Sequence, residues 1–410
     1  MKKVLVIGYV WPEPNSSAAG SHMMSILRLY KQQGWQVEFA TPAQKTEHMI
    51  DLANEGISSQ TITLNCDSFD AYITEYQPDI VMFDRFMMEE QFGWRVEKSC
   101  PAALKILDTE DLQCLRNARH QALKANKELN NSLLFSDLAK REIAAILRCD
   151  ISLIISSFEI DLLLNTFNID AQLLHYLPFM VDLSTLPQNT LAYAERKNFM
   201  TIGNFRHAPN WDSVLYLQTI WPLIRKQLPE AELHIYGSYP PPKATALSNP
   251  KTGFIIKGWC DNASLVMEQA RVCLAPIRFG AGIKGKLLDA MKMQTPSITT
   301  SVGSEGMYKD KAWPGVIIDD VNGFANAAVD LYNNETTWQH AQNDSHSLLT
   351  STYDSVALGR ALIKKIAETE QKLIAHRLKN FTGAMLKHHS MASTKYMSQW
   401  IAAKNLNQES

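Results

Sequence analysis

The length of 410 residues exceeds what one hydrophobic core usually covers, and it predicts two or three domains. The chain is 46% hydrophobic and 20% charged, as ordinary globular proteins are. Its formal net charge of -2 excludes a strong whole-protein attraction to nucleic acid or to an anionic membrane.

The cysteines and the apolar segments bear on the cellular location. The six cysteines are scattered, form no CxxC pair and have no zinc-like spacing with histidines, so we expect free thiols in a reducing cytosol. No stretch approaches the roughly 20 apolar residues that a membrane-spanning helix needs. We therefore expect a cytoplasmic protein with no transmembrane segment. Peripheral attachment to the inner face of the membrane is an alternative that the sequence leaves open.

The first half of the chain alternates short apolar runs with segments of helical periodicity. A helix is predicted at 21–33, and 111–148 is expected to form long helices. The predicted strands lie at 4–7, 36–39, 80–83, 105–107, 151–155 and 173–176. Strands that alternate with helices indicate a parallel, doubly wound sheet.

A second alternation follows the polar segment at 182–197, which is the expected linker. Helices are predicted at 213–227 and 286–293, and strands at 199–202, 233–236, 254–256, 272–275, 297–300 and 316–318. Two such units with a cleft between them form a common plan for binding a nucleotide on one side and another substrate opposite. A helical tail begins near residue 337, and from 371 to 410 it carries six Lys or Arg against one Glu.

The densest signal for chemistry lies at 275–291, where a predicted buried strand leads into a glycine-rich loop and a helix. Glycines let the backbone approach a ligand closely, and the N–H groups of a first helical turn favour a phosphate. The residues concerned are Gly280, Gly282 and Gly285, with the cations Arg278, Lys284 and Lys286. Asp289, about a turn further on, could accept hydrogen bonds from a ribose or sugar hydroxyl. The alternative is a loop with solvated lysines, and the spacing excludes a P-loop.

This stretch, Arg-Phe-Gly-Ala-Gly-Ile-Lys-Gly-Lys-Leu-Leu-Asp-Ala-Met from Arg278 to Met291, resembles the donor-site signature of retaining glycosyltransferases with the GT-B fold, of the family-four (glycosyl transferases group 1) type. Segments 203–210, 235–237 and 256–259 are similar to further landmarks of that family, in the expected order. In the first half, 107–112 with Arg116 is similar to an acidic motif of such enzymes.

The resemblance implies an α/β fold of GT-B architecture, with two doubly wound Rossmann-like domains facing across a cleft and a C-terminal helical tail. The expected domains are an acceptor domain at 1–185, a donor domain for the nucleotide sugar at 196–365, and a basic tail at 366–410 that returns to the first domain. The donor-binding residues that it implies, together with those from the loop itself, are Arg206, His207, Asn210, Gly237, Gly258, Trp259, Arg278, Gly280, Ala281, Gly282, Ile283, Leu287 and Asp289.

The sequence departs from the family pattern at two places. Members commonly carry two glutamates that frame the loop, whereas the first position here is near Ala281 and the second is the shorter Asp289. The usual Arg and Lys clamp for the diphosphate is also altered, since Asn204 and Asn210 stand near those positions. Phosphate charge would then rest on Lys284, Lys286, Arg278 and Arg206.

Two segments of the first half are further candidates. The loop and helix start with Ser17, Ala19, Gly20 and His22 would face the phosphates or the acceptor, or would simply be a capped helix start, with Ser17 or Ser21 as the N-cap and His22 on the helix surface. Asp108, Glu110 and Asp111 follow a predicted strand and could orient an acceptor hydroxyl or steady positive charge at the anomeric carbon, with Arg116 close enough to pair with this cluster. The alternative there is an N-cap role for Asp108 or Thr109.

The expected function is transfer of a sugar from a nucleoside diphosphate sugar to an acceptor, with retention of anomeric configuration. Catalysis would be mostly electrostatic, carried by Lys284, Lys286, Asp108 and Glu110, and would need neither a metal nor a cofactor. The acceptor would be a glycan, a lipid-linked glycan or another macromolecule, and a nucleic-acid acceptor is the remotest of these. The alternatives are a catalytically silent protein that binds nucleotide sugar or glycan, and a sugar-nucleotide epimerase.

Overall fold

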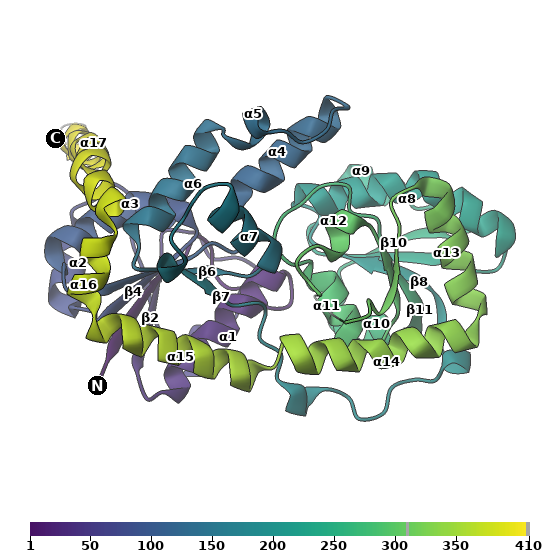
Figure 1. Ribbon diagram of the computed structural model, residues 1–410. Coiled ribbons are helices and arrows are strands. Elements are labelled where there is room, and N and C mark those ends of the chain that lie inside the picture. The colour runs from purple at the N-terminus through teal and green to yellow at the C-terminus, as the bar shows by residue number, and fades with distance from the viewer. Residues whose placement is uncertain (309–310, 407–410) are drawn as a thin grey trace.

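The computed structural model describes residues 1–308 and 311–406, without the side chains of 389–392 and 406. It contains two parallel β-sheets, each covered by helices, which form two units side by side (Figure 1). The strands of the first sheet are β1 (Lys3–Ile7), β2 (Gln36–Thr41), β3 (Ser58–Thr61), β4 (Ile80–Asp84), β5 (Leu104–Asp108), β6 (Ile151–Ile154) and β7 (Leu174–Tyr176). Those of the second are β8 (Lys197–Ile202), β9 (Leu233–Tyr236), β10 (Phe254–Gly258), β11 (Ala270–Ala275), β12 (Ser297–Thr299) and β13 (Gly315–Ile317).

Helices connect the strands and continue beyond the last one. Those of the first unit are α1 (Ala18–Gln32), α2 (Ser68–Tyr76), α3 (Phe86–Ser99), α4 (Gln113–Lys124), α5 (Asn131–Leu134), α6 (Asp137–Arg148) and α7 (Ser157–Asn165). The second unit has α8 (Ala208–Gln227), α9 (Pro242–Thr245), α10 (Ala263–Gln269), α11 (Gly285–Lys292), α12 (Ser301–Ser304), α13 (Val321–Asn333) and α14 (Glu335–Thr352). The tail comprises α15 (Ser355–Gln371), α16 (Leu373–Lys379) and α17 (Phe381–Leu406).

Both sheets are doubly wound. Their strand orders are β3-β2-β1-β4-β5-β6-β7 and β10-β9-β8-β11-β12-β13, and every pairing is parallel. In the first sheet the chain starts at β1, adds β2 and β3 on one side, and then places β4 on the other side of β1. The second sheet repeats this arrangement with β8, β9 and β10 followed by β11. The switch points, where ligands bind in open α/β sheets, therefore lie between β1 and β4 and between β8 and β11. The fold expected from the sequence is confirmed.

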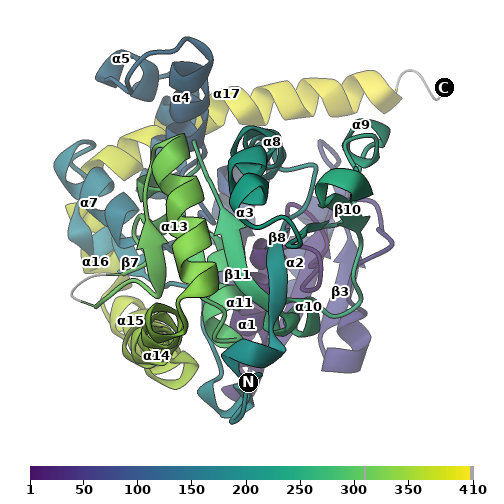
Figure 2. The ribbon, with the colours of Figure 1, turned by 90° about the vertical axis from the view of Figure 1, so that its right-hand side faces the viewer.

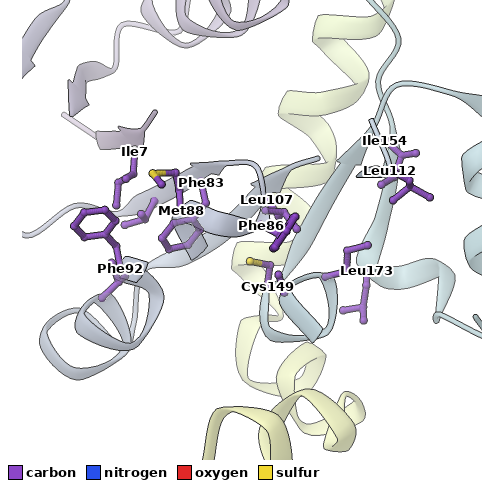
Figure 3. Packing of buried hydrophobic residues seen from close by; sticks show 14 of the residues in the cluster. Ile7, Phe83, Phe86, Met88, Phe92, Leu107, Leu112, Cys149, Ile154 and Leu173 are labelled. Atoms are coloured by element: carbon purple, nitrogen blue, oxygen red, sulfur yellow. The ribbon is translucent and has the colours of Figure 1, made fainter. Parts of the chain in front are cut away.

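The apolar runs form strands because both faces of each sheet are covered. On one face of the first sheet, Phe83 and Leu107 pack against Phe86, Met88 and Phe92 of α3 (Figure 3). The polar edge strand β3 lacks this pattern, since Ser58 to Thr61 are all exposed, and the sequence did not indicate it. Within the described residues, no helix combines the length and the hydropathy needed to cross a bilayer.

The chain returns to the first unit at the junction of α14 and α15, along the lower side of Figure 1. Val181 N donates to Tyr353 O at 2.7 Å, and Ser355 N donates to Val181 O at 2.9 Å. Leu362 and Ile366 of α15 are buried in the same cluster as α1, because an exposed apolar stripe on α15 would cost free energy in water. The expected boundary at 365 therefore falls inside a helix that already belongs to the first unit.

Candidate functional site

A cleft of about 1630 Å³ lies between the two units. Its walls are the segments that follow the central strands: the loop after β1 and the start of α1, the residues after β4 and β5, and the loops after β8 and β11. These are the carboxyl ends of the strands on both sides of each switch point. The two sheets thus present their ligand-binding edges to one shared space.

The donor-side wall is the glycine-rich loop that leads into α11. The loop leaves β11, turns at Gly282 with φ of +61°, and begins the helix at Gly285. No side chain caps the first turn; Leu287 N donates to Lys284 O at 2.9 Å, which leaves the amides of Gly285 and Lys286 for a ligand. A Cβ on Gly285 would lie 2.3 Å from Cβ of Ala18 in the opposite unit, so only glycine allows this close approach.

Two lysines stand beside that helix start. Lys284 Nζ donates to Gly282 O at 2.9 Å, whereas Lys286 forms no ion pair within the described part of the chain. The enclosing walls lower the pKa of each lysine to about 8, because burial disfavours the ammonium form. Near pH 7 both carry positive charge, and Lys286 keeps its hydrogen-bond donors for a ligand.

Most of the residues expected to bind the donor line the cleft. They are Arg206, His207, Asn210, Gly237, Trp259, Gly280, Ala281, Ile283 and Asp289, together with Lys284 and Lys286. Gly258, Gly282 and Leu287 lie behind this wall, with Leu287 fully buried in the core. Asp289 lines the cleft and also pairs with Lys292 at 2.9 Å.

The position of Arg278 differs from the expectation. Its guanidinium makes two hydrogen bonds to Asp212 of α8, at 2.9 and 2.5 Å, and it packs on the ring of Tyr216. The side chain does not line the cleft, because this bidentate pair holds it on the outer side of the loop. The structure therefore contradicts the phosphate contact expected of Arg278, whereas the other expected cations, Lys284, Lys286 and Arg206, line the cleft.

Opposite the lysines lies a cluster of buried carboxyl groups at the ends of β4 and β5, formed by Asp84, Asp108 and Glu110. Burial raises the pKa of Asp108 and of Glu110, and repulsion from Asp84 and Asp108 respectively raises them further. Glu110 lines the cleft with a positive φ of 61°, while Asp108 lies just behind it. Arg85, also at the wall, places Nε 3.8 Å from Asp84 Oδ1 and partly offsets the negative charge.

Two alternatives raised for this region are wrong. Asp108 and Thr109 do not cap α4, because Glu142 accepts the first amides of that helix, Gln113 N and Cys114 N, at 2.9 Å each. His22 is not on the helix surface: its side chain is fully buried, with Nε2 3.9 Å from Asp108 Oδ1. The expected N-cap at Ser17 is confirmed, since Gly20 N donates to Ser17 Oγ at 3.0 Å, and Arg116 pairs with Asp111 beside the cluster.

Several buried polar atoms on this side of the cleft have no hydrogen-bond partner among the described residues. They are both ring nitrogens of His22, Oδ2 of Asp108 and Oδ1 of Asp84. Buried polar groups are normally hydrogen-bonded, and leaving one unpaired costs about 1–3 kcal/mol. Such a concentration beside a cleft is typical of a site that is completed by a hydroxylated ligand or by water.

The burial of His22 leads to a stability prediction. Burial lowers the pKa of His22 to about 4, so below its ordinary value of about 6.5 only the unfolded chain takes up a proton. The free energy of unfolding therefore decreases as pH falls from about 6.5 towards 4.

Between pH 6.5 and 5, the wild type should lose about 2 kcal/mol of unfolding free energy through His22, and His22→Asn should not show this part of the loss. Urea unfolding of both proteins at the two pH values measures it. The exposed His340→Asn serves as the control, and parallel curves for wild type and His22→Asn would refute the assignment.

Glu159 of α7 joins the two units from a buried position that does not line the cleft. Its Oε1 accepts both Leu112 N, at 2.9 Å in the first unit, and Gly282 N, at 2.8 Å in the donor-side loop. The side chain is fully buried, and burial, with repulsion from Asp111, raises its pKa to about 8. One carboxyl group thus ties the segment after the acidic cluster to the loop that carries the lysines.

A second set of contacts from α4 reaches the same loop. Arg119 donates to Gly280 O at 2.9 Å and forms a bidentate ion pair with Glu305. The ring of His120 stacks on Phe279 at 4.2 Å between centroids. The donor-side loop is therefore shaped from both units.

The outer end of the cleft is bridged by small and aromatic residues. Ser16 Oγ lies 2.9 Å from Ser238 Oγ, and Tyr239 OH donates to Glu13 Oε1 at 3.1 Å. The rings of His48 and Trp259 stack at 3.9 Å across the two units, and Arg206 lies over Tyr239 at 3.7 Å. The serine pair, the Tyr239–Glu13 hydrogen bond and the His48–Trp259 stack thus join the two units directly, whereas Arg206 and Tyr239 belong to the same unit.

Sequence reasoning missed four residues that join the units, namely His48, Arg119, His120 and Glu159, and it also missed Arg85 at the wall of the cleft. A weak signal existed for Glu159, since it follows the end of a predicted strand as Glu110 does. An acid in the first turn of a helix is so common, however, that its default interpretation is a favourable interaction with the helix dipole. Within the described residues, no group of three or more His, Cys, Asp or Glu side chains is arranged to hold a metal ion.

Comparisons with known proteins agree with this geometry. Residues 196–334 match the family model for glycosyl transferases group 1. An uncharacterised 44.6 kDa protein from the cps region of Klebsiella pneumoniae is 25% identical over 176 residues, a match that spans 41% of this chain and 45% of that protein.

Similar solved structures cover nearly the whole chain. A variant of S. aureus TarM in complex with fondaparinux, alpha-GlcNAc-glycerol and UDP has a TM-score of 0.69 at 10% identity, covering 89% of this chain and 99% of that one. Anabaena HepE in complex with UDP has a TM-score of 0.66 at 10% identity, over 90% and 100%. Sucrose-phosphate synthase from Thermosynechococcus elongatus has a TM-score of 0.63 at 15% identity, over 92% and 100%.

These likenesses extend over both units, whereas the family match lies in the second, which carries the glycine-rich loop. The chain therefore has the GT-B fold, and its residues 196–334 resemble the group 1 glycosyltransferases.

Proposed function

We propose that this protein is a glycosyltransferase that moves a sugar from a nucleoside diphosphate sugar to an acceptor. The observation that carries the proposal is the placement of an uncapped helix start and two half-buried lysines opposite a buried carboxyl cluster, in one cleft between two units. The first side suits a diphosphate, since helix N–H groups and ammonium groups stabilise phosphate charge. The second offers acceptors for hydroxyl groups.

In the proposed reaction, the bond between the anomeric carbon and the diphosphate oxygen breaks while the acceptor oxygen bonds to that carbon. Negative charge develops on the departing diphosphate beside Lys284 and Lys286, where preorganised cations stabilise it most effectively. The acceptor's proton passes to the leaving diphosphate, so that retention requires no strong external base. Glu110 would hydrogen-bond to the acceptor hydroxyl, and Asp108, which accepts Glu110 N at 3.3 Å, would hold Glu110 in position. We invoke no metal or cofactor.

Support from similar proteins is of two kinds. The matched family is one of glycosyltransferases, and two of the structurally similar proteins were solved with UDP. For this chain we propose a nucleoside diphosphate sugar as donor and a glycan, a lipid-linked glycan or another macromolecule as acceptor. The K. pneumoniae relative from a cps region makes bacterial glycan synthesis the setting we favour.

The deciding experiment is a thermal-unfolding screen against UDP-, GDP- and ADP-linked sugars, followed by mass spectrometry of reactions with a panel of acceptors. A ligand that binds the folded state raises the unfolding temperature in proportion to its affinity. We expect one nucleotide class to stabilise the protein and its sugar to appear on an acceptor. If no nucleotide sugar shifts the transition, the proposal fails.

A second candidate is a protein that binds nucleotide sugars without turnover. It is favoured by Ala281 and by Asp289, which stand where the family commonly carries glutamates, and by the pairing of Asp289 with Lys292. Tight binding together with no transfer to any acceptor would select this candidate over the enzyme.

A further inference from the structure

The C-terminal helix α17 leaves a large apolar stripe uncovered. Its inner face packs on α3 and α6, where Arg95 Nη2 donates to Ser398 Oγ at 3.1 Å and Lys387 pairs with Glu97. On the opposite side, large apolar side chains are about half or more exposed: Phe381, Met385, Tyr396 and Trp400. Figure 2 shows α17 running along one edge of the molecule to the C-terminus.

The spacing of these residues places them on one face. At about 100° per residue, Phe381, Met385, Tyr396 and Trp400 fall within one arc of about 100° that points away from Ser398. Just before them in the chain, Ile374 and Leu378 of α16 form an i, i+4 pair and are 80% and 76% exposed. We call Phe381, Met385, Tyr396 and Trp400 the outer stripe of α17. The four residues form two i, i+4 pairs on one face, Phe381 with Met385 and Tyr396 with Trp400, and such paired exposed apolar groups favour an interaction surface over scattered surface residues.

Positive charge borders this stripe on both sides. Lys395 and Lys404 fall about 40° beyond its two edges by the same helical geometry. Each ammonium lies near an aromatic ring of the stripe, at 5.6 Å from Tyr396 and 5.4 Å from Trp400. The sequence from 381 to 406 contains no Asp or Glu, although the whole chain has a net charge of -2. A surface that complements this face is apolar and negatively charged.

We propose that the outer stripe of α17 docks on the surface of an anionic lipid bilayer. A helix that lies in the bilayer interface buries apolar side chains among the lipids while its lysines reach the phosphate groups. Tyr and Trp are enriched at this depth because their rings are apolar and their polar atoms stay wet. A second copy of this chain fits less well, because two such faces would bring lysines of like charge together with no carboxylate between them.

The test uses the full chain and vesicle co-sedimentation. Vesicles of phosphatidylcholine alone are compared with vesicles of equal parts phosphatidylcholine and phosphatidylglycerol, at low and high NaCl. We expect binding to the anionic vesicles, release by salt and little binding to the neutral ones. Because each lysine near an anionic surface is worth about fivefold in partitioning, Lys395→Glu with Lys404→Glu should lower the partition coefficient by more than about tenfold.

The apolar contribution is tested by Tyr396→Ser with Trp400→Ser, which should also lower the partition coefficient by about tenfold or more. The matched control is Leu265→Ser, which removes a large apolar side chain exposed on α10 and should bind vesicles as the wild type does. Circular dichroism and thermal unfolding establish that each variant is folded.

Unchanged vesicle binding by either double variant would overturn the proposal, as would equal binding to neutral and anionic vesicles. Gel filtration with light scattering tests the second copy directly. The stripe is a subunit interface instead if two results are obtained together. The wild type is a dimer that binds no vesicles, and the variant Tyr396→Ser with Trp400→Ser is a monomer. These measurements need no donor or acceptor, so their outcome is independent of the proposed reaction.

Discussion

Replacing Lys286 with alanine should lower kcat/KM by about 10- to 150-fold, which corresponds to about 1.5–3 kcal/mol for a hydrogen bond to a charged group. Lys286 stands at the uncapped start of α11 and has no ion-pair partner in the described part of the chain. If it stabilises charge that develops on the leaving diphosphate, the loss should fall mainly on kcat. Steady-state kinetics with the donor identified in the thermal screen measures both constants.

The pH dependence makes this test specific. Because burial lowers the pKa of Lys286 to about 8, its ammonium is lost as pH rises through that value. The ratio of wild-type to Lys286→Ala activity should therefore shrink above about pH 8. The control is Lys226→Ala, an exposed lysine at the end of α8. A constant ratio across pH, or unchanged turnover in Lys286→Ala, would remove this lysine from the mechanism.

Replacing Glu159 with alanine should affect both stability and activity. The change leaves two buried amides, Leu112 N and Gly282 N, without an acceptor, at about 1–3 kcal/mol each. We expect the free energy of unfolding to fall by about 2–4 kcal/mol. Since Gly282 belongs to the donor-side loop, we also expect kcat/KM to fall by about tenfold or more, because small displacements of a positioned loop are costly. Glu159→Gln, which keeps an acceptor oxygen, should restore most of both.

The chain offers a matched control in Glu142→Ala. Glu142 likewise accepts two backbone amides, Gln113 N and Cys114 N, but both lie within the first unit at the start of α4. It should destabilise the protein to a similar extent and lower kcat/KM less than Glu159→Ala does, at a temperature where the variant is folded, because it touches the donor-side loop only through α4. If Glu159→Ala behaves as Glu142→Ala does, Glu159 has a structural role only.

Some elements were predictable because their signal is local. Val4 to Ile7 and Val272 to Ala275 are continuous apolar runs, and such runs form strands wherever helices cover both faces of a sheet. The glycine-rich loop was recognisable for a similar reason, since a strand, several glycines and a helix start follow one another directly in the chain. The edge strand β3 escaped because Ser58 to Thr61 form a strand only through backbone pairing with β2.

The electrostatic assignments required the fold. Arg278 and Lys286 are both cations of one loop, yet Arg278 pairs with Asp212 of α8 while Lys286 faces the cleft. His22 occupies a helix position that the sequence marks as surface, yet in the fold its ring packs against Phe179 and lies beside Asp108. Partners distant in sequence decide these outcomes, because charge and burial depend on distances in space.

The sequence by itself determined the two doubly wound units, the order of their strands along the chain and the position of the donor-side loop. Hydrophobic periodicity and glycine placement act over neighbouring residues and can be read there. Only the tertiary structure decided that Glu159 and Arg119 hold that loop from the other unit, that α15 begins the return to the first unit, and that α17 leaves an apolar stripe exposed. Each depends on which surfaces meet when the units close, and no local pattern specifies that.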